Sequence, residues 1–144
     1  MKKLISIVTP TFNEEANIEK LCTKISEIME KSEYNYEHIV IDNNSTDNTV
    51  KILRKLALTN KNLKIILNSR NFGQLNSPVH ALLQTSGDAA IAMSADFQDP
   101  PDLIVKYLEE WEKGYNVVLG QKETSEENFF INFFRKLYFK FISF

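Results

Sequence analysis

The chain has little of several residue types, and each shortage excludes a class of protein. Cys22 is the single cysteine in 144 residues, so no disulfide forms within the chain and nothing requires an oxidising compartment. Four glycines are few for this length, which argues against a linker or low-complexity protein. The 17 Lys and Arg against 19 Asp and Glu leave a net charge of −2, which gives no electrostatic reason to expect nucleic acid as the main partner.

Long apolar runs are also missing. No stretch approaches the roughly 20 apolar residues that a membrane-spanning helix needs. The apolar run at residues 4–8 meets Pro10 too soon for a signal peptide, whose core has about 7–15 apolar residues. We therefore interpret this run as the first strand of one domain that faces the cytosol, since the length suits a single core.

The end of the chain has an unusual composition. Seven of the ten phenylalanines lie between residues 129 and 144, where the charged residues are three cations and no acid. A helix over 126–144 would place the aromatic side chains on one broad face, which is typical of a helix lying in a membrane interface. The alternative is a helix that packs on the core of the domain, over residues 1–125, or on a second protomer in a homo-oligomer. A chain that stops inside such a segment suggests a fragment of a longer protein.

Short apolar runs alternate with amphipathic helical stretches along the rest of the chain. The predicted strands are 4–8, 38–41, 63–67, 89–93 and 116–119. The predicted helices are 14–31, one capped by Asp47, one from about Ser77 with Pro78 in its first turn, one opened by Pro100 and Pro101, and one from Glu126. This alternation predicts an α/β fold, with a mostly parallel sheet that helices cover on both faces.

Polar residues cluster directly after the first four predicted strands, at 9–14, 42–47, 70–73 and 94–99. In open parallel sheets, ligands bind beyond the carboxyl ends of the strands. The sequence therefore predicts a ligand site where these four loops meet. No G-x-G-x-x-G or P-loop pattern follows any strand, and no Cys/His cluster supports zinc.

Three loop residues suggest specific chemistry. Asp96 and Gln98 would offer a carboxylate and an amide oxygen to Mg²⁺ or Mn²⁺, which would complete its shell with waters and phosphate oxygens. The alternative is that Asp96 only solvates its loop. Arg70 has a planar guanidinium that suits a base carbonyl or a phosphate, although an exposed arginine alone decides nothing. The two histidines, His38 and His80, are interpreted as structural.

Four segments together resemble the family 2 glycosyltransferases with a GT-A fold. They are Thr9-Pro10-Thr11-Phe12-Asn13-Glu14-Glu15, Ile41-Asp42-Asn43-Asn44-Ser45-Thr46-Asp47, Arg70-Asn71-Phe72-Gly73 and Ala95-Asp96-Phe97-Gln98-Asp99-Pro100-Pro101. The chain looks most like the branch of dolichyl-phosphate mannose synthases and undecaprenyl-phosphate glucosyltransferases. The resemblance implies a Rossmann-like GT-A sheet, and it covers nearly the whole chain.

The resemblance also implies roles for individual residues. The nucleotide-sugar pocket would be lined by Thr9, Pro10, Phe12 and Glu14. Asp42 would hold the base, Arg70 would contact base or diphosphate, and Asp96 would reach both the diphosphate and the metal, with Gln98 as second ligand. Lys122 would supply a further cation, so that the expected catalytic residues are Asp96, Arg70 and Lys122.

Several positions depart from the family pattern, among them Gln74, which sits where a lysine often follows the glycine. Phe12 stands where tyrosine is common, Asn43 replaces the second acid of an Asp-Asp pair, and Ser94 replaces the first acid of an Asp-Ala-Asp motif. Asn43 weakens any role that needs two charges at its position, and Ser94 leaves Asp96 as the remaining carboxylate of its motif, so we expect weaker metal binding than the motif normally provides.

The reaction that the resemblance implies is the transfer of a hexose, with inversion, from a UDP- or GDP-sugar to a polyprenyl phosphate at the cytoplasmic face of a membrane. A phosphate nucleophile is already ionised at neutral pH, because its second pKa is about 6, so no general base is required. The alternative is a family 2 enzyme that acts on a glycan hydroxyl in cell-surface polysaccharide synthesis, which would need a base. A receiver-like regulatory domain needs paired acids after the first strand, an Asp after the third and a Lys after the fifth, and Thr9-Pro10-Thr11 and Arg70 do not fit that pattern.

Overall fold

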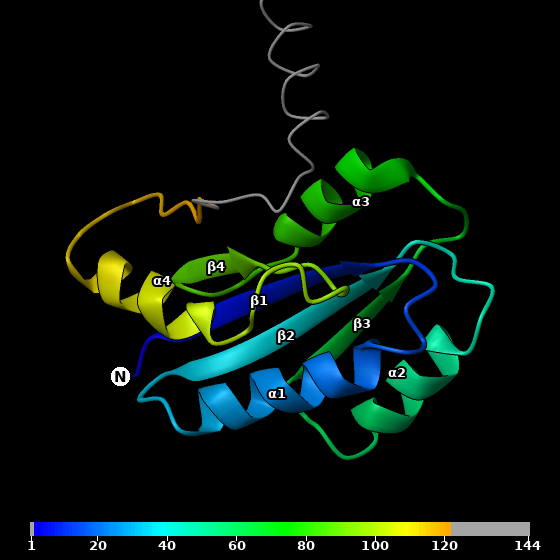
Figure 1. The fold of residues 1–144 in the computed structure, drawn as a ribbon, viewed down its shortest axis with the longest axis horizontal. Coiled ribbons are helices and arrows are strands. Elements are labelled where there is room, and N and C mark those ends of the chain that lie inside the picture. Colours follow the sequence, from blue (N-terminus) through cyan, green and yellow to red (C-terminus); the bar gives the residue numbers. More distant parts are fainter. Residues whose placement is uncertain (1, 122–144) are drawn as a thin grey trace, which may run out of the picture.

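A computed structural model describes residues 2–121 as a four-stranded parallel sheet flanked by four helices (Figure 1). The elements along the chain are β1 (Leu4–Thr11), α1 (Ile18–Glu30), β2 (Asn35–Asp42), α2 (Thr49–Ala57), β3 (Leu63–Leu67), α3 (Gly73–Leu82), β4 (Ala89–Ala92) and α4 (Leu103–Glu112). The strand order is β3-β2-β1-β4, and every neighbouring pair is parallel. The predicted α/β fold with a parallel sheet is confirmed.

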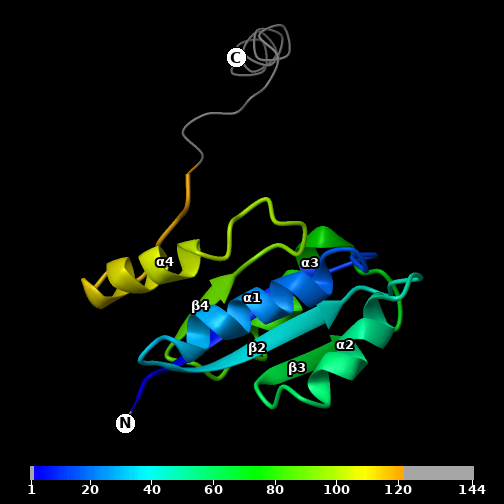
Figure 2. The same ribbon diagram turned by 60° about the horizontal axis from the view of Figure 1, so that its bottom comes forward.

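Helices cover both faces of the sheet, as predicted, but unequally (Figures 1 and 2). The larger apolar cluster joins β-strand residues such as Ile7 and Val40 to α1, α2 and α4. The smaller cluster, on the opposite face, packs Ala81 of α3 against Val8, Ile39 and Ile41. Residues of alternating parity on β1 and β2 therefore point into two different cores, as the pleat of a strand requires.

The predicted fifth strand is wrong. Residues 116–119 form no strand and do not pair with β4, and Val117 and Leu119 are 76% and 86% exposed. Apolar composition favours a strand only where a neighbouring edge supplies hydrogen bonds and cover for the side chains. Here most of the side chains are exposed and no neighbouring strand pairs with the segment, so it lacks that support.

Pro78 also lies differently from the prediction. It is the sixth residue of α3 rather than part of a first turn, because the helix already begins at Gly73. Proline inside a helix removes the hydrogen bond to the carbonyl four residues earlier. That carbonyl belongs to Gln74, an exposed residue, so water can satisfy it.

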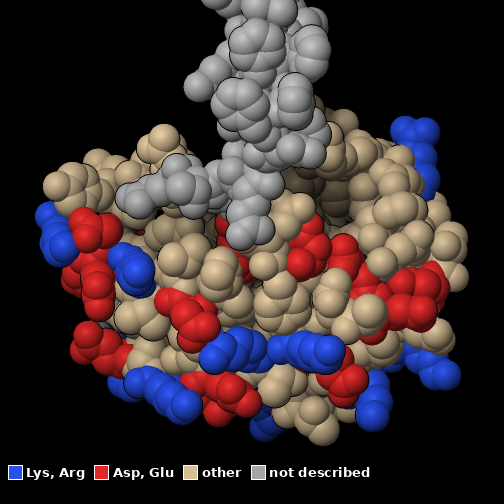
Figure 3. Space-filling model, in the orientation of Figure 1, with Lys and Arg blue, Asp and Glu red and all other residues tan. Residues whose placement is uncertain are grey.

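The predicted helix over 126–144 and Lys122 lie outside the described residues. Within residues 2–121, no helix combines the length and the apolar composition that crossing a bilayer requires. On the face drawn in Figure 3, basic and acidic side chains lie interspersed, and acidic ones gather at the right-hand end, where β1 and β2 end.

Candidate functional site

A cavity of about 370 Å³ lies at the carboxyl end of the sheet, beside β1 and β4. The chain runs from β1 through β2 to β3 on one side and then returns to place β4 on the other side of β1. This reversal of strand order is the position at which open α/β sheets hold their ligands.

All four loops that follow the strands contribute to the cavity wall. The end of β1 and the loop after it contribute Pro10, Thr11, Phe12 and Glu14, and the loop after β2 contributes Asn43. The β3 loop and α3 contribute Asn71, Gly73, Gln74, Ser77 and Pro78, and the β4 loop contributes Ser94, Ala95 and Asp96. The site that the sequence placed beyond the strands is therefore a real concavity.

The backbone passes through the left-handed region in the loops after β1, β2 and β4 and at the first residue of α3. Asn13, Asn44 and Phe97 have φ values of 56°, 66° and 59°, and Gly73 has 85°. Such values are rare for residues other than glycine, above all for an aromatic residue such as Phe97. Strained backbone of this kind clusters at functional sites, where the surrounding structure holds it in place.

The first two loops brace each other. The Asn13 amide N–H donates to the Ser45 hydroxyl, and the Thr46 N–H donates to Asn13 Oδ1, both at 2.8 Å. The Glu14 N–H donates to the Thr49 hydroxyl at 2.8 Å. These bonds fix the β1 loop relative to the start of α2, so the wall formed by Phe12 and Glu14 has a supported backbone.

Asp47 anchors this brace. Its Oδ1 accepts hydrogen bonds from the N–H and the hydroxyl of Thr49 at 2.9 and 2.5 Å, and its Oδ2 accepts one from the N–H of Glu15 at 3.1 Å. Burial alone would raise the pKa of Asp47, but the Thr49 and Glu15 hydrogen bonds outweigh it and hold the pKa below its ordinary value. The predicted capping role of Asp47 therefore extends to both loops.

Several buried polar atoms at this end of the sheet lack a partner. Within residues 2–121, these are Thr11 Oγ1, Asp42 Oδ1 and Ser94 Oγ, which belong to the ends of β1 and β2 and to the loop after β4. Thr11 and Asp42 are register partners on neighbouring strands. Because an unsatisfied buried polar group costs free energy, these atoms favour a site that a polar ligand completes.

The structure brings some of the predicted site residues to the cavity and leaves others away from it. Pro10, Phe12, Glu14 and Asp96 line it. Thr9 does not, because it is buried and its hydroxyl lies 2.9 Å from Nε2 of His38.

Arg70, Asp42 and Gln98 also lie off the cavity wall. The guanidinium of exposed Arg70 packs over the ring of Phe72, 4.8 Å from its centroid. Asp42 is 1% exposed and directly precedes Asn43, which lines the cavity. Its Oδ2 accepts a hydrogen bond from the Ser45 N–H at 2.9 Å. The Gln98 N–H donates to Asp96 Oδ1 at 3.1 Å, which shapes the turn around Phe97.

The two histidines play no part in lining the cavity. His38 is fully buried in β2, and burial lowers its pKa to about 4, so the ring is neutral at physiological pH. His80 lies in α3 beside a different concavity, with Ile66 and Phe72. Buried Cys22 lies in the larger core, where burial raises its thiol pKa to about 12.

The charge of the cavity wall determines how much positive charge a bound diphosphate would need from elsewhere. Glu14 and Asp96 are acidic, and no lysine or arginine within residues 2–121 lines the wall. The same range holds no group of three or more His, Cys, Asp or Glu that could chelate a metal ion alone. One carboxylate, Asp96, and the unpartnered hydroxyl of Ser94 suit Mg²⁺ or Mn²⁺ only if phosphate oxygens and waters supply the other ligands, as these ions commonly accept.

Sequence reasoning missed several cavity residues. From the sequence, Asn43 is interpreted as a lost charge, Ser77 and Pro78 are placed at an ordinary helix start, and Gln74 is assigned no role in the site. The available signal was the concentration of amide and hydroxyl side chains between Asn68 and Ser77, just beyond a strand.

A parallel α/β domain with a polar cavity at its strand-order reversal defines a Rossmann-like ligand-binding protein. Comparison with known proteins makes this class specific, because residues 6–143 match the family described as Glycosyl transferase family 2. The chain belongs to that family, as its loop motifs predicted.

Three curated relatives show the range of the family near this chain. The uncharacterized glycosyltransferase YkcC of Bacillus subtilis is 36% identical over 87% of this chain and 39% of its own length. The undecaprenyl-phosphate 4-deoxy-4-formamido-L-arabinose transferase of Proteus mirabilis is 34% identical over 88% and 39%. The dolichol-phosphate mannosyltransferase of Pyrococcus furiosus is 31% identical over 82% and 33%. The chain spans about two fifths of the length of the curated relatives it matches.

Solved structures support the fold. The mannosyltransferase PcManGT of Pyrobaculum calidifontis, in complex with GDP-Man and Mn²⁺, has a TM-score of 0.64 over 76% of this chain and 32% of its own, at 24% identity. Glucosyl-3-phosphoglycerate synthase of Mycobacterium tuberculosis, in complex with Mn²⁺, UDP and glucosyl-3-phosphoglycerate, has a TM-score of 0.57 over 75% and 39%, at 26% identity. The predicted GT-A fold is therefore confirmed.

Proposed function

We propose that this chain forms the nucleotide-sugar-binding part of an inverting glycosyltransferase, which moves a hexose from a UDP- or GDP-sugar to a polyprenyl phosphate. The observation that carries the proposal is the cavity at the strand-order reversal, where loops from all four strands converge around Asp96. Relatives named for undecaprenyl-phosphate and dolichol-phosphate transfer support the choice of acceptor.

The nucleotide would lie against the β1 loop. Pro10, Phe12 and Glu14 form the wall at that point, and Thr9 supports them from within β1. Asp42 would accept a hydrogen bond from the base or ribose, because its Oδ1 has no partner within residues 2–121. Arg70, on the rim, would leave its contact with Phe72 to approach the base or the diphosphate.

The diphosphate requires positive charge that the described wall lacks. Asp96, with Gln98 as a second ligand, would hold Mg²⁺ or Mn²⁺ against the phosphate oxygens. When bound, such an ion neutralises the leaving diphosphate. Arg70 and Lys122 would supply further charge as catalytic residues with Asp96, and the Mn²⁺ complex of the mycobacterial synthase supports a divalent cation.

A phosphate acceptor suits the groups around the cavity. A polyprenyl phosphate oxygen is ionised at neutral pH and attacks the anomeric carbon without giving up a proton. Direct displacement from the face opposite the diphosphate would invert the anomeric centre. Since neither histidine lines the cavity, the described residues place no imidazole base where a sugar hydroxyl would need one.

The lipid acceptor would bring the enzyme to a membrane surface. We propose that residues 126–144 lie at that surface on its cytoplasmic side, because their aromatic side chains and cations are those of an interfacial helix. Association of two chains through the same segment, as a homo-oligomer, is the competing arrangement, and cross-linking with and without vesicles distinguishes the two.

The proposed function is tested by thermal unfolding of the chain with UDP or GDP, each with and without Mn²⁺. A saturating ligand should raise the melting temperature by about 5 °C, since tight binding to the folded state adds a few kcal/mol. Asp96→Asn should remove the Mn²⁺-dependent part of the rise, whereas Asp99→Asn, three residues away and outside the cavity, should keep it. Failure of both nucleotides to shift the wild type would contradict the proposal.

A further inference from the structure

Asn43 occupies an unusual position between β2 and the next loop. It is the first residue after β2, it is 6% exposed, and its amide faces the segment from Asn68 to Gly73. Its Oδ1 accepts hydrogen bonds from the Phe72 N–H at 2.9 Å and from Asn68 Nδ2 at 3.1 Å. Its Nδ2 donates to Asn71 Oδ1 at 2.8 Å and to the Gly73 carbonyl at 3.3 Å.

The two backbone contacts define which chemistry this position needs. Phe72 presents an N–H that donates to this side chain, whereas the Gly73 carbonyl and Asn71 Oδ1 accept from it. A side-chain amide supplies both an acceptor and a donor from one planar group, and an ionised carboxylate supplies acceptors alone. Asn43, which replaces the second acid of the motif, therefore supplies both the acceptor and the donor for this loop.

We propose that Asn43 is a positioning residue, which holds the Arg70–Gly73 loop as one wall of the nucleotide cavity. The inference rests on the proposed function, because the loop contributes to binding only if a nucleotide occupies the cavity. Asn43, Asn71 and Gly73 all line the cavity, so the hydrogen bonds that fix the loop lie directly behind the surface a nucleotide would touch.

The same amide also contacts the residues at the start of α3. Gly73 starts α3 at a φ of 85°, and its N–H donates to Asn71 Oδ1, the atom that Asn43 also contacts. Asn68 donates to both Asn43 Oδ1 and the Ser77 hydroxyl. Asn43 thereby connects β2 to two parts of the wall, the loop and the first turns of α3.

Asn43→Asp is the sharpest variant, because it keeps the size of the side chain and replaces the amide donor with a second acceptor oxygen. It would place negative charge opposite the Gly73 carbonyl and Asn71 Oδ1. We expect amide exchange at Phe72 to become about tenfold faster, measured by hydrogen–deuterium exchange of the full chain, and the affinity for UDP or GDP with Mn²⁺ to fall about tenfold by calorimetry.

Two control variants separate positioning from general effects. Asn62→Asp makes the same change of charge at an exposed residue, and it should alter neither exchange at Phe72 nor nucleotide affinity. Glu37→Gln, at the opposite end of β2, should lower the melting temperature and leave nucleotide affinity unchanged.

Asn68→Ala is a second test of the proposal, because it removes one partner of Asn43 without adding charge. It should speed amide exchange at Phe72 about threefold even if Asn43→Asp does not fold.

Each outcome has a definite meaning. Unchanged exchange at Phe72 in Asn43→Asp, or in Asn68→Ala if the first variant does not fold, overturns the proposal. Faster exchange with wild-type affinity also overturns it, because the loop would then not serve the nucleotide. If the wild type binds neither nucleotide, the proposed function fails, while the exchange data still decide whether Asn43 holds the loop.

Discussion

Two carboxylates on the same strand, Glu37 and Asp42, are buried to nearly the same extent but differ in the hydrogen bonds that their oxygens accept. Glu37 is 4% exposed and Asp42 is 1% exposed. Both oxygens of Glu37 have partners, whereas Asp42 Oδ1 has none within residues 2–121. Since a buried oxygen without a partner is costly, the difference indicates that one end of β2 is built for stability and the other for a ligand.

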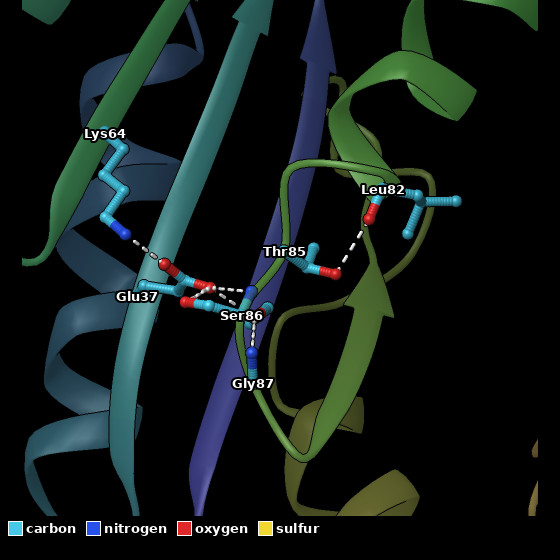
Figure 4. Close-up of polar contacts among 7 residues, drawn as sticks. Glu37, Lys64, Leu82, Thr85, Ser86 and Gly87 are labelled. Carbon is cyan, nitrogen blue, oxygen red and sulfur yellow. Dashed lines mark hydrogen bonds and ion pairs between the residues drawn. The ribbon is translucent and has the colours of Figure 1, made fainter.

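The Glu37 end is a closed network (Figure 4). Glu37 Oε1 accepts hydrogen bonds from the hydroxyl of Ser6 at 2.6 Å and from the N–H and hydroxyl of Ser86 at 2.8 and 3.0 Å, while Lys64 Nζ pairs with Oε2 at 2.5 Å. Burial alone would raise the pKa of Glu37, but the hydrogen bonds from Lys64, Ser6 and Ser86 outweigh it and lower the pKa to about 2.

Backbone packing at this end is equally close. A Cβ on Gly87 would lie 2.7 Å from the Leu4 carbonyl oxygen and 2.8 Å from the Ser6 nitrogen, so only glycine fits without a shift of the backbone. The connection between α3 and β4 is therefore fixed against β1. The cavity end differs in that it combines its hydrogen-bonded loops with left-handed residues and unpartnered buried oxygens.

The largest effect is expected from Glu37→Ala. This change removes the acceptor of four hydrogen bonds and leaves the buried Ser6 hydroxyl without an acceptor, so we expect a loss of about 3 kcal/mol in the free energy of unfolding. Urea denaturation followed by circular dichroism measures it. Glu30→Ala, on an exposed site of α1, should cost less than about 0.5 kcal/mol. A Glu37→Ala loss below about 1 kcal/mol would contradict the comparison.

Acid should weaken the fold in two steps. His38 is neutral in the fold with a pKa of about 4 against an ordinary 6.5, so the unfolded chain binds more protons and stability falls as pH drops from 6.5 towards 4. Glu37, with a pKa of about 2 against 4.5, adds about 2 kcal/mol above pH 4.5 that is lost between pH 4.5 and 2. Unfolding curves across this range measure both steps.

Glu37→Gln separates the two steps. Since glutamine does not titrate, the variant should lose the step between pH 4.5 and 2 and keep the step between pH 6.5 and 4. A variant with the wild-type slope below pH 4.5 would show that another group is responsible.

The Asp42 end should respond in ligand binding rather than stability. Asp42→Ala loses one hydrogen bond, from the Ser45 N–H, and relieves an unpartnered oxygen, so stability should change by less than about 1 kcal/mol. Affinity for UDP or GDP should fall about tenfold, as measured by calorimetry with Mn²⁺. Unchanged affinity together with a large loss of stability would make Asp42 a structural residue like Glu37.

The sequence predicted the parts of this comparison that depend on local pattern. The first four strands, the order of elements and the loops after the strands all follow from short apolar runs and the polar residues that end them. Contacts between distant segments could not be predicted, because they depend on how the strands align. Asn43 meets Phe72 and Gly73, about 30 residues later, only after β3 pairs with β2.

The position of the Arg70 side chain could not be predicted from the sequence either. Its place in the motif fixes the loop, but packing over Phe72 decides where the guanidinium lies in this structure. Residues 116–119 illustrate the converse, because their strand-like composition finds no pairing edge in the described part of the chain.

The smallest effect is expected from Arg70→Lys, which tests whether the rim belongs to the ligand end. Arg70 is exposed and makes a cation–π contact with Phe72, so stability should change by less than about 0.5 kcal/mol. Lysine keeps the charge and loses the planar fork, so affinity for UDP or GDP should fall about threefold if Arg70 turns to the diphosphate. Arg54→Lys, on exposed α2, is the matched control and should leave affinity unchanged. If Arg70→Lys and Arg54→Lys bind UDP or GDP with equal affinity, Arg70 does not contact the nucleotide. The ligand end of the sheet would then consist only of the residues that line the cavity.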